Sequence, residues 1–407
     1  MTESALGPFR ILDLSSYIAG PYCAKMLADY GADVIKIEPT VTGDVSRQIG
    51  PFLNDDPHVE KSLLYFYLNC NKRGISLNLE TYDGRKIFLD LVKTADALIE
   101  SFPPGYLNSL GLGYKELEKC NSGLVLASIT PFGQTGPYRD YAGNDLIYYA
   151  MSGMMYASGA YDREPLKHGH PQSHYMGGMI AAYTISAALF ARSWSGEGQY
   201  IDLSLQECMA AHHHEGATRY AYTGTIERRA PKIGSGSTKG IGFEGIVPAK
   251  DGFIGPTTQR GRPAVSFVEY ADLLGRADIV DPKFETRELR NKNASALDDV
   301  LLPILKSWNK LDYFNTMMSQ GFVAGVVQTP EDLIRCVQLQ ARNFYTEVSH
   351  PIIGEIKIPG EMFRLPECPW EFRRPAPMLG EHNSDIYGRE LGLTKMQLDS
   401  FKELQVI

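Results

Sequence analysis

The sequence predicts an α/β fold with a parallel sheet, on three observations. Up to Ile129 the chain alternates between short β-type runs and helical segments, which is typical of βαβ units. The 407 residues exceed the size of one ordinary core, so we expect two or three domains. Apolar residues make up 43% and charged residues 22%, without a long biased tract, which indicates a globular protein.

The first βαβ unit is the clearest. A strand is expected at residues 9–14, a helix begins at Pro21 and ends before Gly31, and residues 32–38 form a second strand bounded by Pro39. The later elements follow in order: a strand at 75–79, a helix at 83–93, a strand at 97–100, a short helix at 114–119, a strand at 124–129, a helix at 144–153 and an uncharged helix at 180–191. The Gly/Pro-rich loop 130–138 follows a strand, where open α/β sheets usually place ligands.

The net charge of −8 argues against nucleic acid or an anionic membrane as a partner. The six cysteines form no CxxC pair, and we find neither a signal peptide nor an apolar span of 18 residues. We therefore expect reduced thiols and a cytoplasmic location.

Several loops carry charges that suit phosphate. The first loop reads SSYIAGP and lacks the GxGxxG fingerprint, so a dinucleotide site is not expected. Arg47 is the last residue of the turn 42–47, and Lys72 and Arg73 precede a strand. These cations either hold phosphate or lie solvated on the surface.

Residues 166–179, LKHGHPQSHYMGGM, place histidines at the mouth of the uncharged helix. The start of a helix favours an anion and disfavours a protonated imidazole, so a carboxylate would suit position 174 better than His174 does. His174 is either a functional residue or a hydrogen-bonded loop histidine.

The segments DLSSYIAGPYCAKMLADYGADVIKIE, TGDVSR, NCNKRGISLNL, SFPPGYLNSLGLGYKEL, FGQTGPY, NDLIYYAMSG and GEGQYIDLSLQE, with PAPMLGEHNSDIYGRELGL near the end, form a collinear series. This series resembles the class III CoA-transferase family of the CaiB/BaiF type. The resemblance implies a Rossmann-like large domain built from both chain ends, a smaller α+β domain and an interlocked dimer. We expect the large domain at 1–226, the small domain at 227–328, and a linker with the return to the large domain at 329–407.

The family moves coenzyme A between carboxylic acids, with CoA thioesters as substrates and no permanently bound cofactor. Its nucleophile is an Asp, which forms a mixed anhydride and then a thioester with CoA. His174 stands at the position of this Asp, and Asp145 is the nearby substitute. The resemblance assigns six retained CoA-binding candidates: Tyr17, Ile18, Lys72, Arg73, Leu77 and Phe102. Ser109, Pro39 and Glu80 stand where relatives place cations.

The expected function is therefore that of a non-catalytic subunit, paired with a homologous Asp-bearing partner. The chain is similar in this respect to the two-subunit succinyl-CoA:benzylsuccinate CoA-transferases of anaerobic aromatic degradation. One alternative is a self-sufficient homodimer that transfers CoA with Asp145 or His174. A racemase-like enzyme is another, although Asn144 replaces the histidine that such an enzyme needs.

An alternative of another class is a CoA-independent metal- or ligand-binding protein. His168, His170 and His174 lie within seven residues, and a second run, HHHE, covers 212–215. Neither a Cys nor a carboxylate near the first group completes a tetrahedral set, so no metal is expected.

Overall fold

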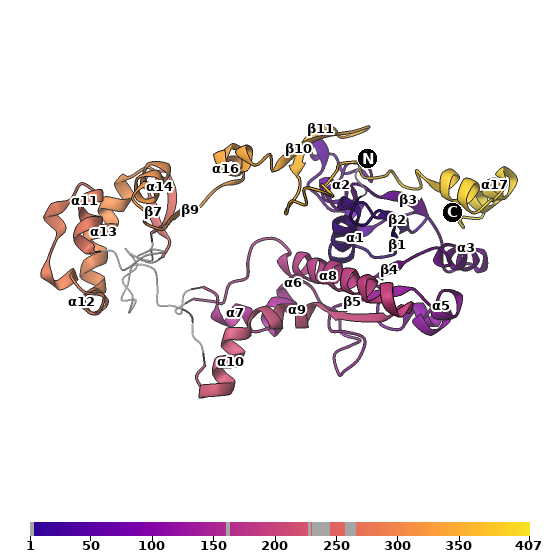
Figure 1. The fold of residues 1–407 in the computed structure, drawn as a ribbon, viewed down its shortest axis with the longest axis horizontal. Helices are drawn as coiled ribbons and strands as arrows, with labels where there is room; N and C mark the ends of the chain where they lie inside the picture. Colours follow the sequence, from indigo (N-terminus) through magenta and orange to yellow (C-terminus); the bar gives the residue numbers. More distant parts are fainter. Residues whose placement is uncertain (1–3, 160–162, 227–228, 230–244, 257–265) are drawn as a thin grey trace. The chain divides into compact units, whose positions relative to one another are not determined.

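A computed structural model describes residues 4–159, 163–226, 229, 245–256 and 266–407 (Figure 1). The contacts divide the chain into two compact units: residues 1–154, 168–214 and 340–407 form the first, and residues 155–167 and 215–339 form the second. Both chain ends thus contribute to the larger unit. The predicted boundaries after 226 and 328 differ from this division by about a dozen residues, and the prediction did not include 155–167 in the smaller domain. The Gly/Ser/Lys-rich loop at 232–240 lies outside the described residues.

The larger unit contains a six-stranded parallel sheet, which confirms the predicted α/β fold. Its order is β3-β2-β1-β4-β5-β6, so the direction of strand addition reverses between β1 and β4. The strands are β1 (Arg10–Asp13), β2 (Asp33–Glu38), β3 (Arg73–Ser76), β4 (Ala97–Glu100), β5 (Val125–Thr130) and β6 (Tyr200–Ser204). Such a reversal opens a crevice at the carboxyl ends of the strands, where ligands of this architecture bind.

One face of the sheet packs against α3 and the C-terminal segment. Leu12, Ile35, Leu98 and Leu126 come from four neighbouring strands, one from each, and form a single buried cluster with Phe88 of α3. The elements near this face are α3 (Tyr82–Val92), α4 (Tyr106–Ser109), α5 (Tyr114–Cys120), the π-helical segment Ser384–Glu390 and α17 (Lys395–Glu403).

The helices α1 (Ala19–Asp29) and α8 (Gln172–Ser195) pack against each other beside β5 (Figure 1). Gly178 permits this contact, because a Cβ at that position would lie 2.6 Å from the carbonyl oxygen of Ala19. Close packing of this kind requires a residue without a side chain. The N-terminal half of α8 therefore lies directly against the first turn of α1.

The remaining described elements of the larger unit are short. They are α2 (Leu63–Asn69), α6 (Asp145–Met151), α9 (Leu205–His212), the antiparallel pair β10 (Tyr345–His350) and β11 (Gly354–Pro359), and the 3-10 turns Val45–Gln48 and Leu53–Asp55. Two helices cross between the units, α7 (Met154–Ala157) and α10 (His214–Thr223), and a third, α16 (Val337–Ala341), lies at the second boundary.

The smaller unit has its own core around Phe284, Leu301 and Tyr313. It combines a three-stranded antiparallel sheet with helices, which matches the predicted α+β character. The strands are β7 (Val247–Ala249), β8 (Gly252–Pro256) and β9 (Ala324–Val326), and the helices are α11 (Phe267–Leu273), α12 (Arg287–Lys292), α13 (Ala294–Ser307), α14 (Lys310–Ser319) and α15 (Pro330–Arg335), with 3-10 turns at Ala277–Ile279 and Pro282–Phe284.

Candidate functional site

His174 lies in the first turn of α8, which begins at Gln172. The prediction of a loop histidine before a helix at 180–191 is wrong, because the helix starts eight residues earlier. The imidazole is 8% exposed. The edges of two tyrosine rings enclose it, with centroid distances of 4.8 Å to Tyr17 and 5.6 Å to Tyr148. His174 therefore sits in an aromatic pocket with little access to water.

This environment keeps the imidazole neutral. Burial lowers the pKa of His174 from 6.5 to about 4, against the opposing attraction of the Asp145 carboxylate. A neutral imidazole at the start of α8 also avoids repulsion from the exposed N–H groups of the helix. The group at the expected nucleophile position is thus an uncharged, enclosed ring.

Asp145 supplies the anion that the start of α8 favours. It is the first residue of α6 and 8% exposed, and Asn144 caps that helix by accepting a hydrogen bond from the Ile147 amide. One Asp145 carboxylate oxygen accepts hydrogen bonds from the Ser173 amide at 3.0 Å and from the Ser173 Oγ at 2.6 Å. Asp145 therefore binds the amino end of α8 directly, a role that a carboxylate performs well.

Tyr17 and Ile18 connect this pocket to the sheet. Tyr17 has a positive φ of 72°, and its amide donates a hydrogen bond to Asp44 at 3.1 Å. Ile18 is buried and packs with Tyr22 and Leu68. The structure therefore brings Tyr17 to His174, whereas Ile18 contributes to a hydrophobic cluster beside it.

Lys72 and Arg73 lie in ion pairs inside the protein. The Lys72 ammonium donates three hydrogen bonds, to Asp13 at 2.9 Å and to the Pro21 carbonyl and Asn69 side chain, each at 2.8 Å. Arg73 donates to both carboxylate oxygens of Asp33 and also bonds Glu390. The expectation of solvated cations is wrong here, because Lys72 is 0% and Arg73 9% exposed. All three N–H donors of the Lys72 ammonium are engaged in hydrogen bonds within the protein.

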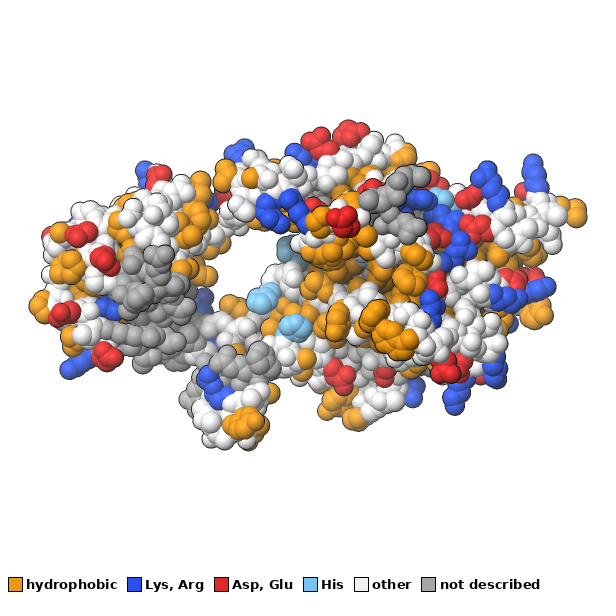
Figure 2. Space-filling view, in the orientation of Figure 1, with side chains coloured by type: hydrophobic (Ala, Val, Ile, Leu, Met, Phe, Trp, Pro, Cys, Tyr) orange, Lys and Arg blue, Asp and Glu red, His pale blue; other side chains and the backbone are white. Residues whose placement is uncertain are grey.

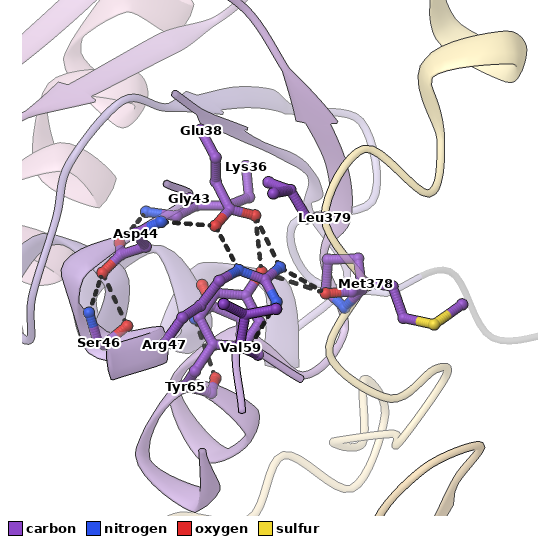
Figure 3. Close-up of polar contacts among 12 residues, drawn as sticks. Lys36, Glu38, Gly43, Asp44, Ser46, Arg47, Val59, Tyr65, Met378 and Leu379 are labelled. Atoms are coloured by element: carbon purple, nitrogen blue, oxygen red, sulfur yellow. Dashed lines mark hydrogen bonds and ion pairs between the residues drawn. The ribbon is translucent and has the colours of Figure 1, made fainter. Parts of the chain in front are cut away.

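Arg47 is likewise not a solvated cation. Its guanidinium is fully buried and binds both carboxylate oxygens of Glu38, at 2.7 and 2.9 Å, and Glu60 at 2.6 Å (Figure 3). It also donates to the Pro377 carbonyl at 3.0 Å and stacks on Tyr65. Arg47 thus ties the turn after β2 to the returning C-terminal segment.

A cavity of about 420 Å³ opens at the carboxyl ends of β1 to β4. Leu77 and Phe102, two of the expected CoA-binding residues, line this cavity. Pro39 and Glu80, which stand where relatives place cations, line it as well. The complete lining is Leu14, Ser15, Ser16, Lys36, Ile37, Glu38, Pro39, Thr40, Val41, Thr42, Gly43, Asp44, Leu77, Asn78, Leu79, Glu80, Phe102 and Tyr106. Two of the six positions that the resemblance associated with CoA, Leu77 and Phe102, therefore lie at one concave site, at the edge that α/β sheets use for ligands, whereas the other four do not line it.

Comparison with known proteins identifies the family that this fold and site represent. Residues 6–383 match the model of CoA-transferase family III. The chain belongs to this family. It is 32% identical to the succinyl-CoA–D-citramalate CoA-transferase of Chloroflexus aurantiacus, with 99% of this chain and 98% of the relative covered. It is also 32% identical to the succinyl-CoA:(R)-benzylsuccinate CoA-transferase subunit BbsE of Thauera aromatica, with 98% and 97% covered.

The crystal structure of a CaiB/BaiF family protein from Brucella suis has the same fold. It superimposes with a TM-score of 0.84 at 29% identity, covering 95% of this chain and 99% of that chain. The recognition of a class III CoA-transferase from sequence motifs is therefore confirmed. As a member of the family, the protein is a CoA-transferase acting between carboxylic acids, with coenzyme A thioesters as substrates.

The histidines do not form a metal site among the described residues. In this part of the chain, no group of three His, Cys, Asp or Glu side chains lies close enough to hold an ion. His168 contacts the Tyr149 hydroxyl at 3.1 Å, and His212 contacts the Cys208 carbonyl at 2.8 Å. The side chains of His214 and Glu215, which belong to the second predicted histidine group, lie outside the described residues. The described helices include none long and apolar enough to cross a membrane.

Sequence reasoning missed Ser173, Tyr148 and Asp44. Ser173 directly precedes His174 and binds Asp145, Tyr148 contacts the imidazole ring, and Asp44 bonds the Tyr17 amide and the Lys36 ammonium, the latter at 2.7 Å. Asp44 and Arg47 share the motif TGDVSR, in which only the cation was considered. A carboxylate beside a tight turn is a signal for loop fixation that the motif did contain.

The lowered pKa of His174 predicts an acid-dependent loss of stability. Since the folded pKa is about 4 and the unfolded one near 6.5, the unfolded state binds the proton first as pH falls through this window. The contribution is absent above pH 6.5 and reaches about 3 kcal/mol of destabilisation at pH 4. The unfolding free energy of the wild type should fall between pH 7 and pH 4 by about 3 kcal/mol more than that of His174→Gln, which has no imidazole to protonate. Urea unfolding of both proteins at the two pH values measures this difference. Equal acid losses in both proteins would contradict the burial argument.

Proposed function

We propose that this chain is the non-catalytic subunit of a heteromeric CoA-transferase, paired with a homologous subunit that carries the nucleophilic Asp. His174 is the observation that supports the proposal. A carboxylate can form a mixed anhydride with the donor acyl group and then become a thioester, because its own carbonyl carbon receives the CoA thiolate. Imidazole has no such carbon, so it cannot carry CoA in this way.

The pocket around His174 supports the same proposal. Nucleophilic attack on a thioester needs an accessible group, whereas this ring is 8% exposed and lies between Tyr17 and Tyr148. The pocket gains packing from the imidazole, since two aromatic edges contact it. We infer that His174 contributes to the packing of this chain and not to catalysis, and that the folded chain supports the partner subunit.

The outer face of α8 supports the presence of a partner. Hydrophobic side chains gather over this helix on the face shown in Figure 2, and Tyr183, Phe190 and Trp194 of α8 are 73%, 68% and 68% exposed. Exposed apolar patches of this kind mark interaction surfaces in proteins. We propose that the Asp-bearing subunit covers this face, in an interlocked arrangement as the family resemblance implies.

Asp145 carries the second candidate, a self-sufficient homodimer. Its carboxylate lies in the same pocket as His174 and is also 8% exposed. Against this candidate, one of its oxygens already accepts two hydrogen bonds from Ser173, so the carboxylate is engaged in binding the amino end of α8. The racemase-like alternative also lacks support. It needs a histidine at position 144, and Asn144 instead caps α6 and provides no base.

The substrates are proposed from the relatives. Two of them have names that include succinyl-CoA together with citramalate or benzylsuccinate. We propose succinyl-CoA as the donor of the complex and a dicarboxylate, such as benzylsuccinate, as the acceptor.

The test of this proposal is whether succinyl-CoA modifies the isolated chain. We expect no covalent adduct when the purified chain is incubated with succinyl-CoA, quenched with hydroxylamine or borohydride, and analysed by peptide mass spectrometry. The Asp-bearing partner, treated identically, serves as the positive control. A hydroxamate at Asp145 after the hydroxylamine quench, or an acyl-imidazole at His174 in an unquenched sample, would instead establish the self-sufficient enzyme.

A further inference from the structure

A second cavity, of about 540 Å³, is lined by α4, α5 and the strands β4, β5 and β6. It lies on the α5 side of the sheet. The Ile99 side chain of β4 is 3.5 Å from the place where a Cβ of Gly20 in α1 would be, so the next residue, Glu100, points to the opposite side. Tyr106 is the one lining residue that this cavity shares with the cavity at the carboxyl ends of β1 to β4. The second cavity is therefore distinct from the pocket at the start of α8.

Three strands of the sheet end at a buried carboxylate, which is Asp13 in β1, Glu38 in β2 and Glu100 in β4. Two of these charges are balanced inside the protein. Asp13 pairs with Lys72 at 2.9 Å, and Glu38 pairs with Arg47 at 2.7 Å. Buried carboxylates need such a partner, because an isolated charge is costly away from water.

Glu100 differs from the other two, because it lines a cavity and has no cation beside it. It is 4% exposed, and its carboxylate accepts hydrogen bonds from the Phe102 amide, at 2.7 Å, and from the Ser128 hydroxyl. Among the described residues, no Lys, Arg or His forms an ion pair with it. Burial, with a smaller contribution from the Asp202 carboxylate, raises the pKa of Glu100 from 4.5 to about 7. A cation that balances Glu100 would therefore have to enter the cavity from outside.

The rest of the lining suits an organic ammonium group. The rings of Tyr114 and Tyr200 line the cavity, with their centroids 5.6 Å apart and an angle of 35° between their planes. The faces of aromatic rings attract ammonium ions. Asn108 and Gln134 also line the cavity and carry amide oxygens that accept hydrogen bonds from such a group. A metal ion fits less well, because no three His, Cys, Asp or Glu side chains meet in the described part of the chain.

The charges around the cavity also favour a cation. Glu116 of α5 lines it, and burial followed by the charges of Glu118 and Glu197 raises the pKa of Tyr114. Lys115 is the one cation of the lining, and its side chain is exposed to solvent. Carboxylates therefore outnumber cations at this site, and the local potential attracts a positively charged ligand.

We infer that this cavity binds a primary alkylammonium ligand, which pairs with the Glu100 carboxylate and lies against the rings of Tyr114 and Tyr200. The ligand supplies the cation that protein side chains supply at the ends of β1 and β2. Where Glu100 is protonated before binding, its proton leaves to solvent and the carboxylate remains paired with the ammonium. The inference is independent of the proposed function, because the cavity shares no lining residue with the pocket of His174.

Isothermal titration of the full-length chain with butylamine tests the inference, with 1-butanol as an uncharged ligand of the same size. We expect the affinity for butylamine to rise about tenfold from pH 6 to pH 8, because the ionised fraction of Glu100 rises from about one tenth to about nine tenths. Titration at pH 6 in two buffers of different ionisation enthalpy should show that close to one proton is released for each ligand bound. The tyrosines of the lining stay neutral here, since burial raises the pKa values of Tyr106, Tyr114 and Tyr200.

Three results would overturn the inference. They are an absence of butylamine binding, binding of 1-butanol as tight as that of butylamine, and an affinity for butylamine that does not change between pH 6 and pH 8. None of these results affects the proposed function, which is tested by the reaction of the chain with succinyl-CoA.

Glu100→Gln provides the sharper comparison, because the glutamine keeps the volume and still accepts a hydrogen bond from the Phe102 amide. At pH 8 we expect it to weaken butylamine binding at least about tenfold, and to abolish the pH dependence and the proton release. Glu118→Gln removes the same charge from an exposed residue of α5 outside the lining and should leave the affinity within about twofold of the wild type.

Tyr114→Leu tests the aromatic wall without changing a buried charge. Tyr114 is partly exposed, so the variant should fold, and it should weaken butylamine binding by about two- to thirtyfold. Thermal unfolding of each variant checks that the fold is retained. Wild-type affinity for butylamine in a folded Glu100→Gln protein, or in Tyr114→Leu, would place the ligand elsewhere and contradict the inference.

Discussion

In the assembled enzyme, replacing the partner's nucleophilic carboxylate with alanine should lower kcat by at least about 1,000-fold. His174→Gln in this chain should leave kcat within about threefold of the wild type, because a residue outside the chemistry affects rate only through the fold. Asp145→Asn should behave in the same way, since an asparagine still accepts hydrogen bonds from Ser173. Steady-state rates with succinyl-CoA, measured on complexes of verified composition, provide the comparison.

The contrast between the variants is more informative than any single rate. Thermal unfolding of each complex controls for loss of fold, and the glutamine at position 174 preserves most of the volume between Tyr17 and Tyr148. A loss of 1,000-fold or so for His174→Gln or Asp145→Asn, with the fold retained, would assign the catalytic group to this chain. The proposed division of labour between the subunits would then be wrong.

Arg47→Met should lower the free energy of unfolding by about 3–5 kcal/mol, because it leaves buried carboxylates without their cation. Glu38 would lose two guanidinium hydrogen bonds and Glu60 one. The loss also removes the bond to the Pro377 carbonyl, so the returning C-terminal segment should exchange its amide hydrogens faster.

The matched control for Arg47 is Arg389, whose side chain is 84% exposed and pairs with Asp385 one helical turn away. Arg389→Met should change the unfolding free energy by less than about 1 kcal/mol, as exposed ion pairs do. Chemical denaturation of both variants measures the difference. An Arg47→Met protein as stable as the control would show that the network in Figure 3 is energetically neutral.

The fold was predictable because its signals are local. Alternating apolar runs bounded by Gly31 and Pro39 specify the first βαβ unit, and the structure places β1, α1 and β2 there. The start of α8 was not predictable in the same way. The segment before the apolar run is polar, and α8 includes it because Asp145, 28 residues earlier in the chain, binds the Ser173 amide.

The site was predictable in its position and unpredictable in its charges. The resemblance assigned Leu77 and Phe102 to CoA, and the structure places both side chains in the lining of the cavity at the carboxyl ends of β1 to β4. The fate of a cation depends on carboxylates that are distant in sequence, as with Arg73 and Glu390, which are separated by 317 positions. Sequence spacing contains no information on such pairs, so phosphate binding and internal pairing could not be distinguished.

The central claim is that the activity belongs to a heteromer in which this chain contributes the structure and its partner the nucleophile. Native mass spectrometry of the protein purified from its own organism, followed by a succinyl-CoA transfer assay on each resolved species, tests the claim most directly. We predict that all activity resides in a complex with a homologous Asp-bearing chain and that this chain alone is inert. An active homodimer of this chain would contradict the account.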